Sequence, residues 1–202
     1  MTNNQYAYLA LGDSYTIGEA VPVYENFPYQ TVQLLRKAGH HFHAAEIVAK
    51  TGWTTDELQN GINATRFQSS YNFVSLLIGV NNQYRGRSVE EYQIQFENLL
   101  QQAIRFANKK AASVFVLSIP DWGVTPFARD RDIKKISSEI DAFNAANKKL
   151  TDTYQCNYIN ITPLTCEAAS DTTLLAADQL HPSGKDYKRW AQLLSTAIIN
   201  KL

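Results

Sequence analysis

The chain has 202 residues, of which 45% are hydrophobic and 19% charged, a composition that excludes a disordered protein and is typical of a globular one. Lysine plus arginine and aspartate plus glutamate number 19 each, so no net charge favours nucleic acid or an anionic membrane as a partner. The N-terminal sequence lacks a signal-peptide pattern, and no run approaches the ~18 apolar residues of a membrane span. We therefore expect a cytoplasmic protein without integral membrane association.

Five segments have the residue pattern of β-strands. Several of them are continuously apolar rather than alternating, as expected for strands that are covered on both faces of a parallel sheet. The segments are "YAYLALG" (6–12), "FHAAEIVAK" (42–50), "YNFVSLLIGV" (71–80), "SVFVLSIP" (113–120) and "NYINITP" (157–163).

Two short helices are expected between the first three of these segments. The segment 27–39 ends on Gly39, a residue type that favours the end of a helix. A second helix is expected to begin near Thr54, because Glu57 stands at the capping-box position three residues later.

Three longer helices are expected in the second half of the chain. The first begins at Ser88, with Glu91 at the capping-box position. The last follows Pro182, which suits the start of a helix. Apolar side chains recur at helical spacing, and we expect them to be buried in each helix. They are Val89, Tyr92, Phe96, Leu99, Ala103 and Phe106 in the first, Ile133, Ile136, Ile140, Phe143 and Leu150 in the second, and Tyr187, Trp190, Leu194 and Ile198 in the third.

The alternation of strands and helices predicts the fold class. Such alternation is typical of βαβ units, in which helices cover both faces of a parallel sheet. No repeat, low-complexity tract or linker divides the chain. We therefore predict a single α/β domain over residues 1–202, a three-layer α/β/α sandwich with a five-stranded, mainly parallel sheet.

Polar residues and glycines follow the strands at what would be one edge of this sheet. Ligands bind outside the carboxyl ends of parallel strands, where the connecting loops converge. At this edge Ser14 can serve as a nucleophile, with His181 as its base and Asp178 as the group that orients the base. The backbone N–H groups of Ser14 and Gly52 and the amide of Asn81 are candidate oxyanion donors.

Four short motifs resemble those of the SGNH (GDSL-type) hydrolases. "GDSYTIG" resembles the nucleophile block, Gly52 stands where the second-block glycine stands, and "GVNN" and "DQLHP" resemble the third and fourth blocks in the family order. The resemblance implies that Ser14, Asp178 and His181 form a catalytic triad with an oxyanion hole of Ser14, Gly52 and Asn81, in a five-stranded α/β/α fold without a cofactor. The chain looks most like the small thioesterase I/lysophospholipase-type and arylesterase-type members, and departs from the family at Asn82, where an aspartate is usual.

Five side chains in the loops at the carboxyl ends of the predicted strands are candidates for the substrate pocket. They are Tyr15, Trp53, Asn82, Tyr84 and Trp122. The expected partner is a small-molecule ester, and short-chain, aryl, thioester, lysophospholipid and acetylated-sugar substrates all remain open, as does the oligomeric state.

Other interpretations of the motifs are also possible. Ser14 in isolation is typical of a helix N-cap, and Asp-Ser at a helix start also occurs at the attachment site of carrier proteins, although those are small acidic helical bundles. The whole chain could be a non-catalytic member of the same fold that binds an acyl or carbohydrate ligand. We expect Cys156 and Cys166 to be free thiols, and no spacing of histidines or cysteines predicts a metal site.

Overall fold

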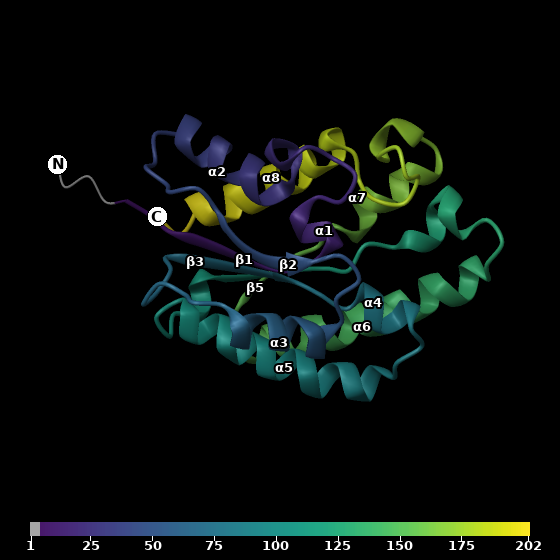
Figure 1. Cartoon of the computed structure of the whole chain (residues 1–202), viewed down its shortest axis with the longest axis horizontal. Coiled ribbons are helices and arrows are strands. Elements are labelled where there is room, and N and C mark those ends of the chain that lie inside the picture. The colour runs from purple at the N-terminus through teal and green to yellow at the C-terminus, as the bar shows by residue number, and fades with distance from the viewer. Residues whose placement is uncertain (1–4) are drawn as a thin grey trace.

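The protein forms a five-stranded sheet between two layers of helices (Figure 1). A computed structural model describes residues 5–202. The strand order is β2-β1-β3-β4-β5 and all four pairings are parallel, which confirms the predicted fold class. The strands are β1 (Tyr8–Asp13), β2 (Glu46–Lys50), β3 (Phe73–Leu77), β4 (Val114–Leu117) and β5 (Asn157–Ile159).

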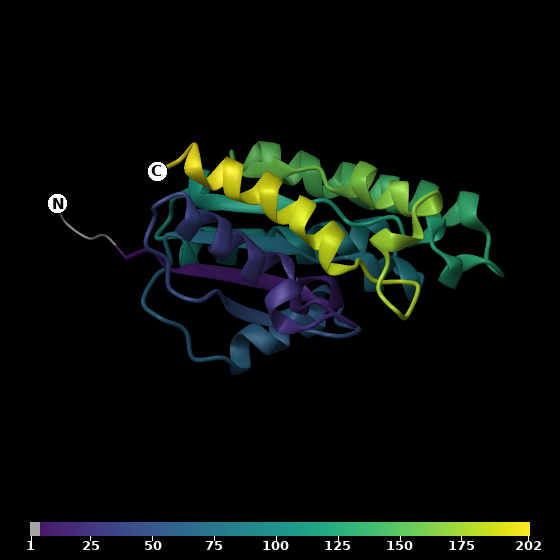
Figure 2. The same cartoon turned by 90° about the horizontal axis from the view of Figure 1, so that it is seen from above.

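Helices cover both faces of the sheet. The layer with α1, α2 and α8 lies on one face, and α3, α5 and α6 lie on the other (Figures 1 and 2). No helix in the described range 5–202 is long and apolar enough to cross a membrane. The α-helices are α1 (Ser14–Ile17), α2 (Phe27–Lys37), α3 (Thr55–Ala64), α4 (Val80–Tyr84), α5 (Val89–Phe106), α6 (Ile133–Thr153), α7 (Thr162–Cys166) and α8 (Gly184–Ile199). The 3₁₀ helices are Val23–Glu25, Ala111–Ser113, Trp122–Val124, Pro126–Ala128, Glu167–Ala169 and Thr172–Leu174.

The central strands are the most buried elements of the protein. Every residue of β1, β3 and β4 is buried, which explains their continuous apolar runs. The strand β3 is shorter than the predicted segment 71–80, because Gly79 has a φ of 133° and Val80 already begins α4. An apolar run alone does not distinguish the end of a strand from a buried turn that follows it.

The two predicted helix starts are confirmed, with Thr54 and Ser88 as the N-caps of α3 and α5, but only one of the two predicted capping boxes is complete. Thr54 donates its N–H to the carboxylate of Glu57 at 2.9 Å, as in a capping box. Ser88 accepts the N–H of Glu91 at 3.1 Å, but the carboxylate of Glu91 contacts Arg87 instead of returning to Ser88, so the second capping box is incomplete.

The last two long helices each correct a detail of the prediction. The side chain of Ile133, at the first residue of α6, is 45% exposed and does not join the core. Helix α8 begins at Gly184 after the N-cap Ser183, two residues later than Pro182, because Pro182 pairs with Leu175 in an antiparallel bridge that holds it extended.

Gly12 allows helix α1 to turn back closely on the strand before it. A Cβ atom at this position would lie 2.1 Å from Oγ1 of Thr16 and 2.4 Å from the carbonyl oxygen of Leu77. Both neighbours are buried and cannot move away without disturbing the core.

We expect Gly12→Ala to lower the free energy of unfolding by about 1–3 kcal/mol, the usual cost of overpacking a core. Urea denaturation of the two proteins measures the difference. Equal midpoints and slopes would show that this turn has more room than the structure indicates.

Candidate active site

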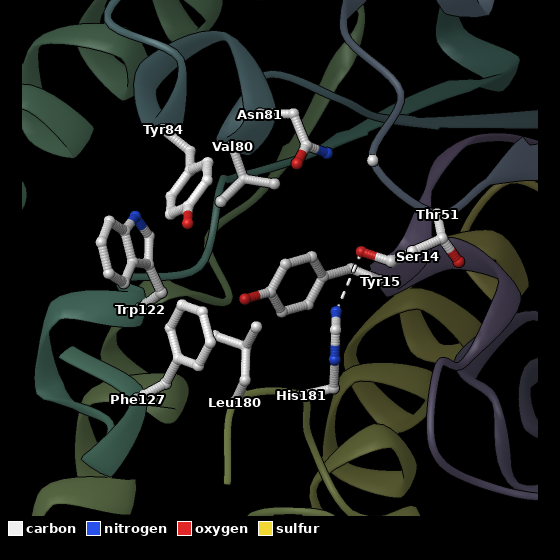
Figure 3. Close-up of a pocket in the computed structure, with 11 residues that line it drawn as sticks. Ser14, Tyr15, Thr51, Val80, Asn81, Tyr84, Trp122, Phe127, Leu180 and His181 are labelled. Carbon is white, nitrogen blue, oxygen red and sulfur yellow. Dashed lines mark hydrogen bonds between the residues drawn. The ribbon is translucent and has the colours of Figure 1, made fainter. Parts of the chain in front are cut away.

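The carboxyl ends of the strands bring the predicted site residues together. Ser14 follows β1, Gly52 follows β2 and Asn81 follows β3, while His181 comes from the loop before α8. All four line one cavity of about 190 Å³ (Figure 3). Asp178 stands behind His181, on the side away from Ser14.

Ser14 is the first residue of α1, and its side chain is not used to cap the helix. The N-cap is Asp13, whose carboxylate accepts the N–H of Tyr15 at 3.0 Å. The hydroxyl of Ser14 is therefore available to His181, and its Oγ lies 2.9 Å from Nε2 of the imidazole. The helix N-cap is therefore Asp13 and not Ser14, which the sequence also indicated as a possible cap.

Asp178 holds His181 through both its backbone and its ring. One carboxylate oxygen accepts the N–H groups of Leu180 at 3.1 Å and His181 at 3.0 Å, and the other lies 2.6 Å from Nδ1 of His181. The tight turn between the two residues is stabilised by a bond of 2.8 Å from the N–H of Ala176 to the carbonyl of His181. A separation of three residues thus lets one carboxylate fix both the loop and the imidazole.

The charge of Asp178 is favoured by these contacts. Partial burial by itself would raise the pKa of the carboxyl, but the hydrogen bonds from the ring and backbone of His181 and from Leu180 lower the pKa below its usual value. In a neutral imidazole whose Nδ1–H donates to this carboxylate, Nε2 is the nitrogen without a proton, and it faces Ser14. This arrangement can remove a proton from the serine hydroxyl.

Gly52 lies in a turn that its neighbours hold in place. Its φ of +81° is one that other residues adopt only with strain. Its carbonyl oxygen accepts a bond of 2.6 Å from the guanidinium of Arg85, which in turn contacts Glu57 at 3.2 Å. Arg85, the residue after α4, therefore holds the Gly52 turn that follows β2 in place.

If the N–H of Gly52 binds the oxyanion, as the sequence predicts, we expect Arg85→Ala to lower kcat about tenfold with little change in KM, a fraction of the cost of losing one oxyanion donor. The reason is that the Gly52 turn loses its anchor while the pocket keeps its lining. Arg87→Ala is the matched control, because Arg87 contacts Asp56 and Glu91 and not this turn. Steady-state kinetics with a p-nitrophenyl ester measure both variants, and equal effects of the two would contradict the assignment.

Asn81 presents its amide at the edge of the cavity. The amide nitrogen donates to the carbonyl of Trp53 at 3.0 Å and lies 3.5 Å from the carboxylate of Asp13, the limit of a hydrogen bond. Because the contact with Asp13 is so long, the amide of Asn81 has one firm protein partner and one weak one, and one of its N–H groups remains within reach of a ligand. Burial raises the pKa of the Asp13 carboxyl to about 7.

Asn82 and Trp53 do not have the pocket positions that were predicted for them. Asn82 is fully buried and pairs with Thr55, accepting its N–H at 3.1 Å and donating to its hydroxyl at 2.7 Å. Successive residues of a helix point about 100° apart, so Asn82 faces α3 when Asn81 faces the cavity. The ring of Trp53 packs over Gly61 in α3 and does not line the cavity. The asparagine at the family's usual aspartate position thus links two helices.

Aromatic and aliphatic side chains form the rest of the cavity. Tyr15, Tyr84 and Trp122 line it, as the sequence indicated. Sequence reasoning missed four more lining residues, namely Thr51, Val80, Phe127 and Leu180. Thr51, Val80 and Leu180 are each next to a predicted site residue in the sequence, and this adjacency could have identified them as lining residues. Phe127 lies in a separate 3₁₀ helix, and no sequence motif marked it.

The described residues 5–202 contain no group of three or more histidine, cysteine or acidic side chains placed to hold a metal ion. Cys156 and Cys166 are both free thiols.

Comparison with known proteins identifies the family. Residues 10–189 match the GDSL-like lipase/acylhydrolase family. The chain belongs to this family. A search of curated proteins gave no match for this GDSL-family chain.

Solved structures of similar fold include several esterases. The lipase/acylhydrolase from Enterococcus faecalis is 18% identical with a TM-score of 0.75, over 98% of this chain and 97% of the other. Axe2, an acetylxylan esterase from Geobacillus stearothermophilus, is 16% identical with a TM-score of 0.70, over 100% and 96%. The psychrotrophic esterase EstA from Pseudoalteromonas sp., in a structure inhibited by monoethylphosphonate, is 15% identical with a TM-score of 0.73, over 97% and 98%. At sequence identities this low, the similarity to these structures shows a shared fold and not a shared substrate.

Proposed function

We propose that this GDSL-family protein hydrolyses carboxylic esters or thioesters of small molecules through an acyl-enzyme on Ser14. The observation that carries the proposal is the hydrogen-bonded series from Asp178 through His181 to Ser14, which opens on a largely apolar cavity. Membership of the GDSL-like lipase/acylhydrolase family supports ester hydrolysis in general.

The first half of the reaction acylates the serine. His181 takes the proton of Ser14 through Nε2 as Oγ attacks the ester carbonyl, and the imidazolium that forms is stabilised by the carboxylate of Asp178. The tetrahedral intermediate collapses when its bond to the leaving oxygen or sulfur breaks. The same proton then passes from Nε2 to the leaving group, which departs as an alcohol or thiol.

The second half repeats the sequence with water. His181 deprotonates a water molecule that attacks the acyl carbon, and the bond to Oγ of Ser14 breaks with return of the proton. The products are the carboxylic acid and the free enzyme.

Three donors are assigned to the oxyanion in both halves. They are the backbone N–H groups of Ser14 and Gly52 and the amide of Asn81, all of which border the same cavity. Preorganised donors of this kind contribute about 2.7–4 kcal/mol each to the stability of a transition state. For Asn81 this requires that the 3.5 Å contact with Asp13 yield to the substrate.

The size and lining of the cavity support a small ester. Its volume of about 190 Å³ is below the roughly 300–1,000 Å³ typical of pockets for drug-sized ligands. Val80, Trp122 and Leu180 offer it apolar surface, which suits a short hydrocarbon group better than a sugar.

A chain-length series of p-nitrophenyl esters, set beside an acetylated sugar and an acyl-coenzyme A, tests this proposal. We expect the highest kcat/KM for short acyl chains, together with covalent labelling of Ser14 by a fluorophosphonate probe. A non-catalytic binding protein of this fold would neither turn over the esters nor react with the probe, and that result would refute the proposal.

A further inference from the structure

A groove of about 290 Å³ lies beside the cavity of the candidate active site, and Tyr84 and Trp122 line both of them. In Figure 3 these two side chains stand on the side of the cavity away from Ser14 and His181. The side chain of Tyr84 is 47% exposed, so the boundary between the cavity and the groove is an open rim and not a closed wall. A substituent of an ester bound at Ser14 can therefore extend past Tyr84 into the groove.

We call this second space the side groove, and it has four charged lining residues. They are Arg131, Asp132, Lys135 and Glu139. The carboxylate of Asp132 accepts the backbone N–H of Lys135 at 3.0 Å as the N-cap of α6. The carboxylate of Glu139 accepts from the amide of Gln83 at 2.8 Å and lies 3.8 Å from the ammonium of Lys135. Both acids and the lysine therefore have partners within the protein.

The guanidinium of Arg131 has no ion pair and no hydrogen bond to any of residues 5–202. It lies over the ring of Tyr84, 6.0 Å from the ring centroid, and the backbone N–H of Arg131 donates to the carbonyl of Ala128 at 2.9 Å. A guanidinium that stacks on an aromatic ring keeps its N–H donors available to a ligand. Arg131 thus offers a positive charge at the rim that separates the cavity from the side groove.

The charges around Arg131 suit a carboxylate. The planar guanidinium matches the two oxygens of a carboxylate, with which it can form two parallel hydrogen bonds. A doubly charged phosphate would meet more repulsion from the carboxylates of Asp132 and Glu139, which line the same groove. A single negative charge on a planar group is therefore the ligand that this arrangement favours.

We propose that Arg131 determines substrate specificity by binding a carboxylate that the substrate carries in addition to its ester group. The substrate class is then a half-ester of a dicarboxylic acid, or an ester of a hydroxy acid, with its free carboxylate in the side groove. The inference rests on the proposed function, since it names the substrate class of the same site. The carboxylate can belong to the acyl chain or to the alcohol, and the experiment separates the two.

Arg131→Glu is the informative variant because it reverses the charge at the side groove. Arg129→Glu is its matched control, because it changes the net charge of the protein equally, two residues away. The side chain of Arg129 is 82% exposed, lies 3.6 Å from Asp130 and lines neither the cavity nor the side groove. Both arginines are exposed at the surface, so neither substitution is expected to unfold the protein.

Each arm of the experiment compares a carboxylate with its neutral amide. The acyl arm uses the mono-p-nitrophenyl esters of adipic and suberic acid beside the corresponding half-amides. The alcohol arm uses the acetate ester of p-hydroxyphenylacetate beside that of p-hydroxyphenylacetamide. The ratio of kcat/KM for the charged and the neutral ester is measured for the three proteins at low ionic strength. Dividing the wild-type ratio by that of a variant cancels the intrinsic reactivity of each ester.

We expect the ratio of charged to neutral ester to fall about tenfold in Arg131→Glu, because a repulsive pair replaces an attractive one, and to change less than about twofold in Arg129→Glu. The fall should shrink at high salt, which screens exposed charges. The arm that shows the effect tells which part of the ester extends into the side groove.

Two results would overturn this assignment of Arg131 while leaving ester hydrolysis in place. One is a set of ratios that agree within about twofold among the three proteins in both arms, and the other is an equal fall in the two variants. In both cases the neutral esters are still turned over. If the wild type turns over no ester and does not react with a fluorophosphonate, the proposed function itself fails, and the role of Arg131 fails with it.

Discussion

Ser14→Ala is expected to lower kcat for a p-nitrophenyl ester by about 10⁴- to 10⁶-fold, the scale seen when a serine hydrolase loses its nucleophile. Without Oγ the acyl-enzyme cannot form, and the remaining donors of the cavity can only assist direct attack by water. The fluorophosphonate adduct should disappear in the same variant. Its thermal midpoint should stay close to that of the wild type, because the Oγ of Ser14 bonds to His181 and not to the helix cap.

Ser195→Ala is the matched control for this prediction. Ser195 is also buried, and its hydroxyl donates to the carbonyl of Gln192 in helix α8, away from the cavity. It should keep full turnover and full labelling at Ser14. Turnover by Ser14→Ala at a rate near that of the wild type would show that another group performs the reaction.

Asp178→Asn is expected to lower kcat by about 10²- to 10⁴-fold through the tautomer of His181. The side-chain oxygen of the introduced asparagine would continue to accept the N–H groups of Leu180 and His181, so the loop should keep its shape. Its NH₂ group would then face Nδ1 of His181, which can accept that bond only in the tautomer that carries the proton on Nε2. A protonated Nε2 facing Ser14 cannot serve as the base.

The measurement is kcat as a function of pH for the wild type and Asp178→Asn, with circular dichroism to check the fold. Asp171→Asn serves as the control. Asp171 caps a 3₁₀ helix in the preceding loop and pairs with Lys185 at an exposed position, where such a pair contributes little. An Asp178→Asn variant as active as Asp171→Asn would mean that the carboxylate does not orient the imidazole.

Much of the fold was predictable because its signals are local. The continuously apolar runs of β1 and β3 predicted a sheet covered on both faces, and the stripe from Tyr92 to Ala103 predicted the buried face of α5. The errors lie at element ends. The bridge between Leu175 and Pro182 delays the start of α8, and such a contact between separate segments leaves no periodic signal in the sequence.

The candidate site could be predicted to a different extent for different residues. Asp178 and His181 are three residues apart, and the turn between them closes through local bonds, so their pairing follows from short-range geometry. Ser14 joins them because it follows a strand of a parallel sheet, and in such sheets functional residues generally gather at the carboxyl ends of the strands. The sequence did not predict that Asn81 lines the cavity while Asn82 is bonded to Thr55, because these positions depend on how α4 is rotated against α3.

The sequence by itself determined the fold class, the family and the set of residues that could carry the chemistry, since strand patterns, helix stripes and short motifs depend on neighbours along the chain. The tertiary structure decided which side chains reach the cavity and which have partners. Arg85 holds the turn at Gly52, Phe127 arrives from a separate 3₁₀ turn, and the hydroxyl of Tyr15 has no hydrogen bond to any of residues 5–202. These features depend on the direction of each side chain and on the pairing of its neighbours, and both are set by packing between elements that are distant in the sequence.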